Sequence, residues 1–411
     1  MKHRYSRREF LSVASATAAA TFWISKAMPA TADHPVIQSI ETFPVMYPMA
    51  GRFKFFEGPE GSPTGRGTIV VKLTAEDGTV GWGQSVPIPK WTYETMESVK
   101  TTIDRYLTPV LIGRDPFDLA GVHSTMDTAI APGFTAGAPL TKAGIDFALH
   151  DLCGRLTGQS LPARWGRQPR SNLLLSWTLN PTSLDDVEPL IQQGWDLGYR
   201  HFNVKVAPDL KFDLELCRMV KRAVPDGFLW ADANGGYRTT SDALEAAPRL
   251  ADVGVAVLEA PLRPNRISGY QALKQQGALP ILMDEGVIRP GDLMEFMKLN
   301  MLDGVAMKPA RCGGLSSARR QIEILLDAGM MWLGSGLTDP DLSLAATLAL
   351  YGAYDYSLPA ALNGPQFLRG SILKQPITPE AGMLAVPTEP GLGVEVDEAS
   401  LASMQIELGR I

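Results

Sequence analysis

Hydrophobic and polar residues follow different patterns in two parts of this chain. In the first part, three stretches have the alternation or the short apolar runs of strands: Val36–Met46, Thr68–Leu73 and Val80–Ser85. Glu76-Asp77-Gly78 joins the last two, which is typical of a hairpin turn. Helical spacing follows over Thr95–Leu107 and Leu140–Thr157. Strands followed by helices predict an α+β domain.

From about residue 171, short apolar runs alternate with segments of helical spacing such as Phe212–Ala223 and Thr240–Val253. The eight runs are Leu173–Leu179, Tyr199–Val206, Phe228–Ala233, Val255–Ala260, Pro280–Asp284, Gly304–Lys308, Met330–Gly334 and, more weakly, Ser357–Leu362. Eight regular strand–helix units favour a closed parallel (β/α) barrel over an open doubly wound sheet. No Gly-x-Gly-x-x-Gly follows the first run, as a dinucleotide-binding sheet would require.

Charged residues stand at the ends of five successive runs: Lys205, Asp232, Glu259, Asp284 and Lys308. The C-terminal ends of barrel strands converge on one mouth, so we expect three carboxylates there with a lysine on either side. Clustered carboxylates repel one another unless a cation lies among them, and ligation by oxygen alone suits Mg²⁺. A lysine that felt the metal and partial burial would have a lowered pKa and could act as a general base.

These segments resemble the enolase superfamily, specifically its muconate-lactonizing subgroup. The matching pieces are Val204-Lys205-Val206, Asp232-Ala233-Asn234-Gly235-Gly236, Glu259-Ala260-Pro261, Met283-Asp284-Glu285, Lys308-Pro309-Ala310-Arg311-Cys312-Gly313-Gly314 and Pro390-Gly391-Leu392-Gly393. The resemblance implies a (β/α) barrel of the enolase type with an N-terminal α+β capping domain. We expect a capping domain over 33–160, a barrel over 161–375 and a segment over 376–411 that returns to the capping domain.

The resemblance also implies a mechanism. Asp232, Glu259 and Asp284 would hold Mg²⁺, the substrate carboxylate would bind that metal, and loss of its α-proton would give an enediolate intermediate. Lys205 and Lys308 would flank the substrate on opposite faces. The loop Met49–Gly67, which we expect to be mobile, would close the site, with Phe53, Lys54 and Phe55 as further candidates in it. The candidate substrate-binding residues are Asn203, Asn234, Glu285, Arg52 and Asp339.

The sequence departs from the family pattern at two places. Asn203 stands two residues before Lys205, where the family commonly has a lysine, so one positive charge near the substrate carboxylate is missing. Thr338 stands where many relatives carry glutamate, and the adjacent Asp339 and Asp341 could either bind a substrate cation or cap the next helix.

The five histidines also narrow the chemistry. None lies beyond residue 201, which excludes the histidine–aspartate dyad of the mandelate racemase subgroup. We expect His150 and His201 to be structural, because neither would stand at the mouth of the barrel.

Several reactions remain open, because the superfamily scaffold serves all of them. Two opposed lysines fit racemisation or epimerisation, with an amino-acid derivative or a dipeptide as the substrate. Ser176-Trp177-Thr178-Leu179 resembles the muconate cycloisomerases, which keeps lactonisation open, and dehydration of a hydroxy acid is a third reaction. Two non-enzymatic alternatives are an exported barrel that binds a carboxylate or metal, and a phosphate-binding barrel that uses Gly313-Gly314.

The first 32 residues have the order of a signal peptide. Arg7 and Arg8 precede an apolar stretch over Phe10–Ile24, and Ala30-Thr31-Ala32 forms a small-residue cleavage pattern before Asp33. The paired arginines resemble the twin-arginine signal, so we expect the twin-arginine export machinery as a partner and a periplasmic or otherwise exported protein. A disordered basic tail is the alternative. The apolar stretch is too short and too rich in Ala, Ser and Thr for stable membrane insertion.

Composition adds three limits. A hydrophobic content of 45% and a charged content of 20% are those of a globular protein. The formal net charge of −6 argues against nucleic acid as a partner. Three widely spaced cysteines predict free thiols, although one disulfide stays open for an exported protein. We expect a homo-oligomer that acts on a small-molecule carboxylate.

Overall fold

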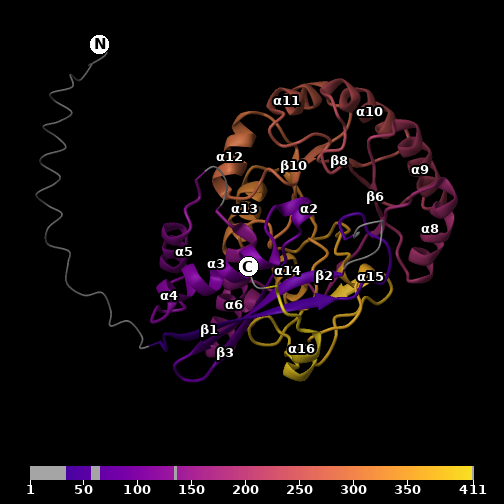
Figure 1. Cartoon of the computed structure of the whole chain (residues 1–411). Coiled ribbons are helices and arrows are strands. Elements are labelled where there is room, and N and C mark those ends of the chain that lie inside the picture. The colour runs from indigo at the N-terminus through magenta and orange to yellow at the C-terminus, as the bar shows by residue number, and fades with distance from the viewer. Residues whose placement is uncertain (1–33, 57–64, 134–136, 410–411) are drawn as a thin grey trace, which may run out of the picture. The chain divides into compact units, whose positions relative to one another are not determined.

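The computed structural model describes residues 34–56, 65–133 and 137–409 (Figure 1). The predicted signal peptide over 1–32 and part of the predicted loop, residues 57–64, lie outside these ranges. Residues from Val36 onward form one unit with its own core, and the following paragraphs concern this unit.

The N-terminal strands form an antiparallel sheet in the order β1-β2-β3. Its strands are β1 (Ile37–Tyr47), β2 (Arg66–Ala75) and β3 (Val80–Ser85), which confirms the three predicted strands. The turn between β2 and β3 places Gly78 at a φ of 85°, a left-handed conformation that favours glycine. The side chain of Asp77 accepts a hydrogen bond from the Thr79 amide at 2.9 Å and stabilises the same turn.

Helices follow this sheet along the chain, and several of them pack against its strands. They are α2 (Pro89–Thr92), α3 (Met96–Thr102), the π-helical turn η2 (Ile103–Leu107), α4 (Thr108–Leu111), α5 (Leu119–Ala129), α6 (Pro139–Thr157) and α7 (Leu161–Arg164). α6 lies so close to β3 that a Cβ on Gly83 would come within 2.1 Å of the Gly144 carbonyl oxygen. α6 is buried on all sides along most of its length, because it also packs against helices of the second domain.

The second domain is built on a parallel sheet in the order β5-β6-β7-β8-β9-β10-β11. The strands are β5 (Trp177–Leu179), β6 (Phe202–Lys205), β7 (Leu229–Asp232), β8 (Val257–Glu259), β9 (Ile281–Met283), β10 (Gly304–Met307) and β11 (Met331–Gly334). The helices that follow them are α8 (Val187–Asp196), preceded by the short η3 (Leu184–Asp186), then α9 (Leu210–Ala223), α10 (Thr240–Asp252), α11 (Ile267–Gln276), α12 (Pro290–Lys298), α13 (Leu315–Asp327) and α14 (Asp341–Ala353). Seven of the eight predicted apolar runs therefore contain a strand of this sheet.

Two expectations for this sheet were wrong. The run 357–362 forms no strand in the described chain; isolated bridges instead join Leu175 to Ala360 and Ser335 to Ala361. The first run, expected as one strand over Leu173–Leu179, is divided between β4 (Asn172–Leu174) and β5. β4 turns away because it pairs antiparallel with β12 (Met383–Ala385), which comes from the end of the chain.

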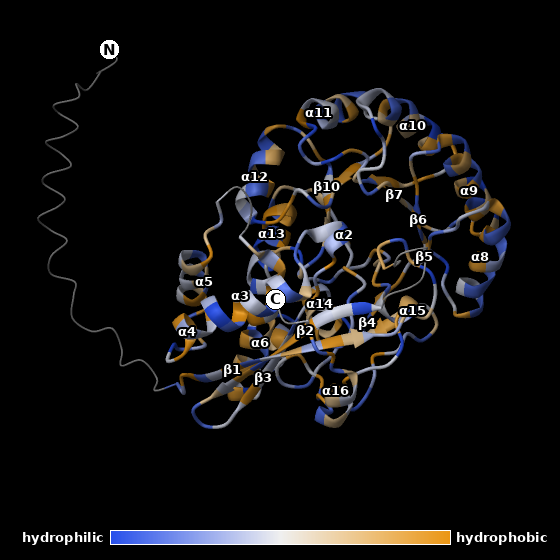
Figure 2. Ribbon diagram, in the orientation of Figure 1, coloured by the Kyte–Doolittle hydropathy of each residue, from blue (hydrophilic) through white to orange (hydrophobic). Residues whose placement is uncertain are grey.

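An apolar layer fills the inner face of the parallel sheet. It consists of Trp230, Val257, Leu282, Ala306, Leu333 and Ala361. The first four stand two residues before the charged strand ends, and residues two apart in a strand share a face. The charged residues therefore lie directly above this layer. Figure 2 shows the hydrophobic colouring concentrated on these strands, with polar colouring on the outer sides of the surrounding helices.

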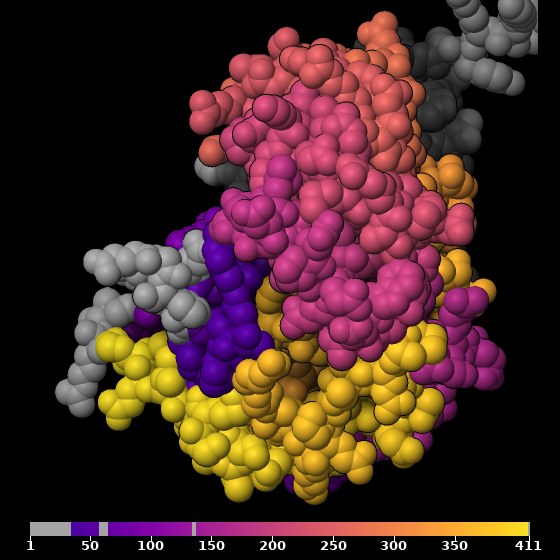
Figure 3. All heavy atoms as spheres, turned by 90° about the vertical axis from the view of Figure 1, so that its right-hand side faces the viewer, coloured from indigo at the N-terminus to yellow at the C-terminus, as the bar shows by residue number. Residues whose placement is uncertain are grey.

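The C-terminal segment contacts both domains. It contains α15 (Gly364–Phe367), β12 and α16 (Glu398–Met404). Gln405 forms a bridge with Val45, and the Ile406 amide donates a hydrogen bond to the Pro44 carbonyl at 3.0 Å. In the space-filling view, the indigo N-terminal part of the chain and the yellow C-terminal part lie side by side (Figure 3).

Two further expectations concern thiols and membranes. Cys153, Cys217 and Cys312 are all buried and free, which confirms the prediction of structural thiols. Within the described ranges, none of the helices combines the length and the apolar character that crossing a membrane requires.

Candidate active site

The parallel sheet brings the charged strand ends together in one row. Lys205, Asp232 and Glu259 are Cα partners across β6, β7 and β8, so they lie side by side. Asp284 and Lys308 directly follow β9 and β10. None of the five side chains is more than 9% exposed. We call Asp232, Glu259 and Asp284 the carboxylate row, and the two lysines stand at its ends.

Each lysine forms an ion pair with the row. Lys205 Nζ lies 2.5 Å from Asp232 Oδ2. Lys308 Nζ contacts Asp284 and lies 3.4 Å from Glu259 Oε1. Because both lysines are buried, these pairs are screened only weakly by solvent.

The predicted residue Asn234 supports the first carboxylate. Its backbone amide and its side-chain Nδ2 donate hydrogen bonds to Asp232, at 2.9 and 3.1 Å. The backbone of Asn234 is left-handed, with a φ of 46°, which asparagine tolerates better than most residues. This turn lets one residue donate twice to the carboxylate, so Asn234 positions a member of the row.

Arg311 supports the third carboxylate. Its guanidinium contacts Asp284 and also donates a hydrogen bond to the Ala306 carbonyl at 2.9 Å. Arg311 belongs to the segment Lys308–Gly314, which carries part of the family resemblance, and no role was predicted for it. It is buried at 5% exposure, so its charge acts on Asp284 with little solvent screening.

Burial and mutual repulsion control the charge states in the row. Burial raises the pKa of Glu259 well above its usual range, and the charge of Asp232 raises it further. Burial alone would also raise the pKa of Asp284, but Lys308 and Arg311 lower it overall. Burial lowers the pKa of Lys308, but the charges of its carboxylate neighbours outweigh burial and raise it. The lowered lysine pKa that we expect beside a bound metal ion stays a prediction.

The donor set of the row fits a hard divalent cation. Its oxygen ligands come from three neighbouring strands, and Mg²⁺ prefers carboxylates over softer ligands. Among the residues that the structure describes, no three of these groups are arranged as a coordination shell. Each carboxylate of the row instead interacts with a lysine or an arginine, as buried like charges require. Burial and the charge of Asp232 raise the pKa of Glu259, so a cation near Glu259 would stabilise its charged form.

Aromatic side chains of the capping domain cover both lysines. The ring of Phe53 lies 5.9 Å from Lys205 Nζ. The ring of Trp91, on α2, lies 4.3 Å from Lys308 Nζ, and Phe55 stacks on Trp91 with ring centroids 4.5 Å apart. Phe53 is buried, so this residue of the predicted loop packs onto the site instead of projecting into solvent.

Two more predicted residues lie beside the row. Glu285 accepts a hydrogen bond from Trp91 Nε1 at 2.8 Å, and burial, followed by the charge of Asp284, raises its pKa to about 7. Asn203 is 1% exposed and shares a face of β6 with Lys205. Its Nδ2 has no hydrogen-bond partner in the described ranges. Asn203 is therefore a buried, neutral donor next to the first lysine.

Arg52 stands further out. Its side chain is exposed, and its Nη1 lies 3.4 Å from the carbonyl oxygen of Asn180, which follows β5. It lines a cavity of about 440 Å³ together with Trp177 and Phe367. The structure therefore places Arg52 at the rim, on the side of the sheet where β5 ends.

Asp339 is buried and binds groups of the second domain. Burial raises its pKa, and it accepts hydrogen bonds from the Leu337 amide at 3.1 Å and from Ser343 Oγ at 2.9 Å. Asp341 accepts from the Tyr47 hydroxyl at 2.8 Å and from the Ile372 amide at 2.8 Å. Both aspartates lie next to the start of α14, but in the described chain neither side chain accepts a hydrogen bond from the first amides of that helix. The substrate-binding role of Asp339 stays a prediction.

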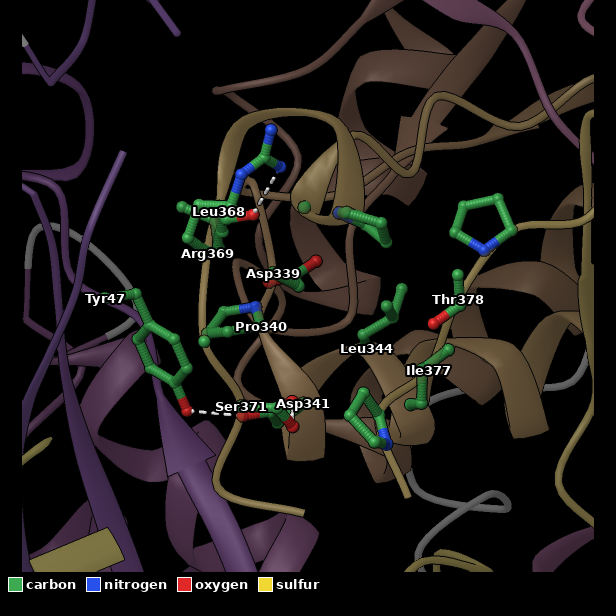
Figure 4. Close-up of a pocket in the computed structure, with 15 residues that line it drawn as sticks. Tyr47, Asp339, Pro340, Asp341, Leu344, Leu368, Arg369, Ser371, Ile377 and Thr378 are labelled. Atoms are coloured by element: carbon green, nitrogen blue, oxygen red, sulfur yellow. Dashed lines mark hydrogen bonds between the residues drawn. The ribbon is translucent and has the colours of Figure 1, made fainter. Parts of the chain in front are cut away.

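The two aspartates border a cavity of about 190 Å³ (Figure 4). Tyr47 enters it from β1, and Leu344 and Arg369 line it from the second domain. The figure shows the Tyr47 hydroxyl directed toward Asp341 and Ser371. Because these polar groups bind one another, this cavity belongs to the junction of the domains and not to the carboxylate row.

Comparison with known proteins agrees with this geometry. Residues 61–164 match the model of the mandelate racemase/muconate lactonizing enzyme N-terminal domain, and residues 186–400 match the enolase C-terminal domain-like model. The chain belongs to the enolase superfamily.

Its relatives include isomerases. It is 27% identical to muconate cycloisomerase 1 of Rhodococcus opacus, over 88% of this chain and 96% of that protein. It is 24% identical to the N-succinyl-L-Arg/Lys racemase of Bacillus cereus, over 90% of this chain and 98% of the racemase. The muconate lactonizing enzyme of Pseudomonas fluorescens, solved with muconolactone, superposes with a TM-score of 0.83 at 27% identity, over 90% of this chain and 100% of that one.

Sequence reasoning missed some residues that shape the site of this superfamily member. Trp91 covers Lys308, and Phe367 stacks on Phe53 with ring centroids 4.7 Å apart. Arg311 binds Asp284. Trp91 sits on the four-residue helix α2, where the pattern gives no signal of function. Arg311 lay three residues beyond a predicted catalytic lysine, so its charge was a usable signal.

The two histidines that we expected to be structural are buried or bonded away from the row. His150 is 2% exposed, and its Nε2 lies 3.1 Å from Ser316 Oγ on α13. His201 accepts a hydrogen bond from the Phe228 amide at 3.0 Å, at the opposite end of β6 from Lys205.

Proposed function

We propose that this protein moves the α-proton of a small carboxylate substrate and acts as a racemase or epimerase of an amino-acid derivative or dipeptide. The observation that carries the proposal is the pair of buried lysines at the two ends of the carboxylate row. Lys205 ends β6 and Lys308 follows β10, with three strands between them. A reaction that removes a proton on one face and returns it on the other needs two such groups.

The carboxylate row would hold Mg²⁺ in this proposal. Members of the superfamily use this ion, and the oxygen donors of the row fit it. The raised pKa of Glu259 also fits, because a nearby cation would stabilise the charged carboxylate. When bound, Mg²⁺ would neutralise the substrate carboxylate and make its α-proton more acidic. Asn234 and Arg311 would keep Asp232 and Asp284 in place while the lysines are released from the row.

The protein's own groups supply the remaining requirements. Lys205 and Lys308 take and return the proton. Phe53 and Trp91 exclude water from the two ammonium groups, which strengthens every electrostatic interaction in the site. Their rings also restrict the substrate to the space between the capping loop and the strand ends.

Cycloisomerisation is the second candidate, favoured by the 27% identity to muconate cycloisomerase 1 over nearly the whole chain. This reaction forms or opens a ring and needs a proton on one face only. It therefore predicts that one of the two lysines is dispensable for proton exchange.

The test follows the α-proton directly. The protein, loaded with Mg²⁺, is incubated in D₂O with N-acyl amino acids, dipeptides, hydroxy acids and muconate, and NMR follows the α-proton. Exchange with inversion of the α-carbon that needs both Lys205 and Lys308 supports the proposal. Exchange or ring closure that survives Lys205→Ala or Lys308→Ala supports the second candidate. A Lys72→Ala variant is the control, because Lys72 pairs with Glu398 outside the site.

We also propose that the protein is exported by the twin-arginine route, on the strength of Arg7, Arg8 and the apolar stretch that follows them. Replacing both arginines with lysine should retain the protein in the cytoplasm. Fractionation of cells that express either form tests this, and export of the doubly substituted chain would contradict it.

A further inference from the structure

Among the described residues of the site, one cation forms no ion pair with a carboxylate. Lys205, Lys308 and Arg311 each contact a member of the carboxylate row. Lys54, on the capping loop, forms no ion pair or hydrogen bond through its ammonium group in the part of the chain that the structure describes; its contact is with the ring of Phe55, whose centroid lies 5.1 Å away. A partly buried ammonium group without an anion is costly, and a bound anion would remove that cost.

The two residues that flank Lys54 in the chain contact groups at the two ends of the row. Phe53, which precedes it, covers Lys205, and Phe55, which follows it, stacks on Trp91 beside Lys308. Burial lowers the pKa of Lys54 to about 8, and the charge of Lys205 lowers it further, while three carboxylates raise it: Asp232, Glu285 and Glu259. The charges that act on Lys54 are thus those of the site itself.

On β6, the described residue that shares a face with Lys205 is not a cation. Asn203, which shares its face of β6, is neutral, and its amide nitrogen is buried without a partner in the described residues. A carboxylate that enters the site next to Lys205 therefore meets a neutral donor from the strand. Lys54, on the capping loop, is a further positive charge near Lys205.

We propose that Lys54 binds the reacting carboxylate of the substrate and supplies the positive charge that Asn203 does not. This inference rests on the proposed function, because it assigns a residue to the same site. The ammonium group donates a charge-assisted hydrogen bond to a carboxylate oxygen as the capping loop packs over the strand ends. Substrate binding then links the two domains, because the substrate bridges Lys54 on one and the row on the other.

The experiment uses the full Mg²⁺-loaded protein and the compound that exchanges fastest in the D₂O panel. Lys54→Met removes the charge and keeps an unbranched side chain, and Lys54→Arg keeps the charge. Lys72→Met is the matched control, because Lys72 Nζ lies 5.0 Å from the ring of Trp82 in the same domain, away from the row. Thermal melting of each variant confirms that it folds.

We expect Lys54→Met to raise KM about tenfold or more, the effect of losing a hydrogen bond between charged groups, with a smaller change in kcat. Lys54→Arg should restore most of the affinity, and Lys72→Met should match the wild type. Calorimetry provides a second readout that needs no turnover. The same compound with its carboxylate converted to a primary amide should bind Lys54→Met and the wild type equally, whereas the acid should bind the variant about tenfold more weakly.

Three results would overturn the inference. Unchanged KM and unchanged acid binding in Lys54→Met would show that the charge is not used. Equal weakening of the acid and the amide would show that Lys54 shapes the loop and does not bind the carboxylate. A fall in kcat alone would place Lys54 in proton transfer. If the wild type exchanges no compound in the panel, the proposed function fails and this inference falls with it, whereas exchange without a Lys54 effect overturns the inference alone.

Discussion

Two groups of buried carboxylates in this protein differ in the partners that surround them. The first is the carboxylate row at the strand ends. The second consists of Asp146, Asp151 and Asp341, which we call the interface carboxylates because each receives hydrogen bonds across the junction of the domains. The row interacts mainly with charged side chains, whereas the interface carboxylates accept hydrogen bonds largely from backbone amides and hydroxyl groups.

The interface carboxylates are satisfied by the protein itself. Asp146, on α6, accepts from the first amide of α13 at 2.5 Å and from Ser316 Oγ at 2.6 Å. Asp151 accepts from the Trp82 amide at 2.8 Å and the Leu392 amide at 2.7 Å. These amides and hydroxyl groups have fixed positions in the fold, so such carboxylates stabilise the junction and have little freedom to bind anything else.

The row lacks partners of this kind on its central member. Among the described residues, the Glu259 carboxylate hydrogen-bonds only with Lys308 Nζ, at 3.4 Å, and burial raises its pKa well above its usual range. Because lysine side chains can move away while backbone amides cannot, the row can exchange its protein cations for a metal ion. The clearest difference lies at Glu259, whose partner in the described chain is a lysine and not a backbone amide. Elsewhere the two groups overlap, because Asp232 also accepts from the Asn234 amide and Asp151 also pairs with Arg155.

The largest expected effect concerns the two lysines at the ends of the row. Lys205→Ala and Lys308→Ala should each slow α-proton exchange with inversion by about 10²–10⁴-fold, the usual contribution of a positioned acid or base. NMR in D₂O measures this effect. Asp341→Asn, at the junction, should leave the exchange rate per folded molecule unchanged. If either lysine variant racemised the substrate as fast as the wild type, the carboxylate row would be no more important for the reaction than the interface carboxylates.

The next effect is a pH dependence at the junction. Burial lowers the pKa of His150, next to Asp146, to about 4. The unfolded chain, with a histidine pKa of about 6.5, binds more protons between these values, so the free energy of unfolding should fall as the pH falls from 6.5 to 4. The loss should reach about 3 kcal/mol. Urea denaturation at several pH values measures it, and His150→Gln should flatten this part of the profile; an unchanged slope would contradict the assignment.

Binding of Mg²⁺ should stabilise the protein only through the row. At a concentration of one hundred times Kd, the ion should raise the free energy of unfolding by about 2.7 kcal/mol. Thermal melting with and without Mg²⁺ measures the shift. Glu259→Gln should lose most of it, while Asp146→Asn, although less stable, should keep it. Equal shifts in both variants would mean that the ion binds elsewhere.

The smallest effect is structural. Asp341→Asn exchanges an acceptor for a donor and leaves a buried group unpartnered among Tyr47, Ser371 and Ile372. The free energy of unfolding should fall by about 2 kcal/mol. Urea denaturation measures the loss, and a variant as stable as the wild type would show that the junction tolerates an unpaired group.

Much of the site followed from local pattern. The runs that end in Lys205, Asp232 and Glu259 became β6, β7 and β8 with these residues aligned, because a parallel sheet sets equivalent strand ends side by side. The pattern failed where a distant segment competes for a strand. Residues 172–174 match the apolar pattern of β5, but they pair with β12, more than 200 residues later.

The sequence alone therefore determined which residues stand at the strand ends and what chemistry they offer together. This was possible because apolar periodicity and the spacing of charged residues are local properties of the chain. Only the tertiary structure decided that Asp341 binds Tyr47, that Arg311 holds Asp284, and that Trp91 lies over Lys308. These roles come from contacts between segments far apart in the chain, and the packing of the capping domain on the sheet creates those contacts.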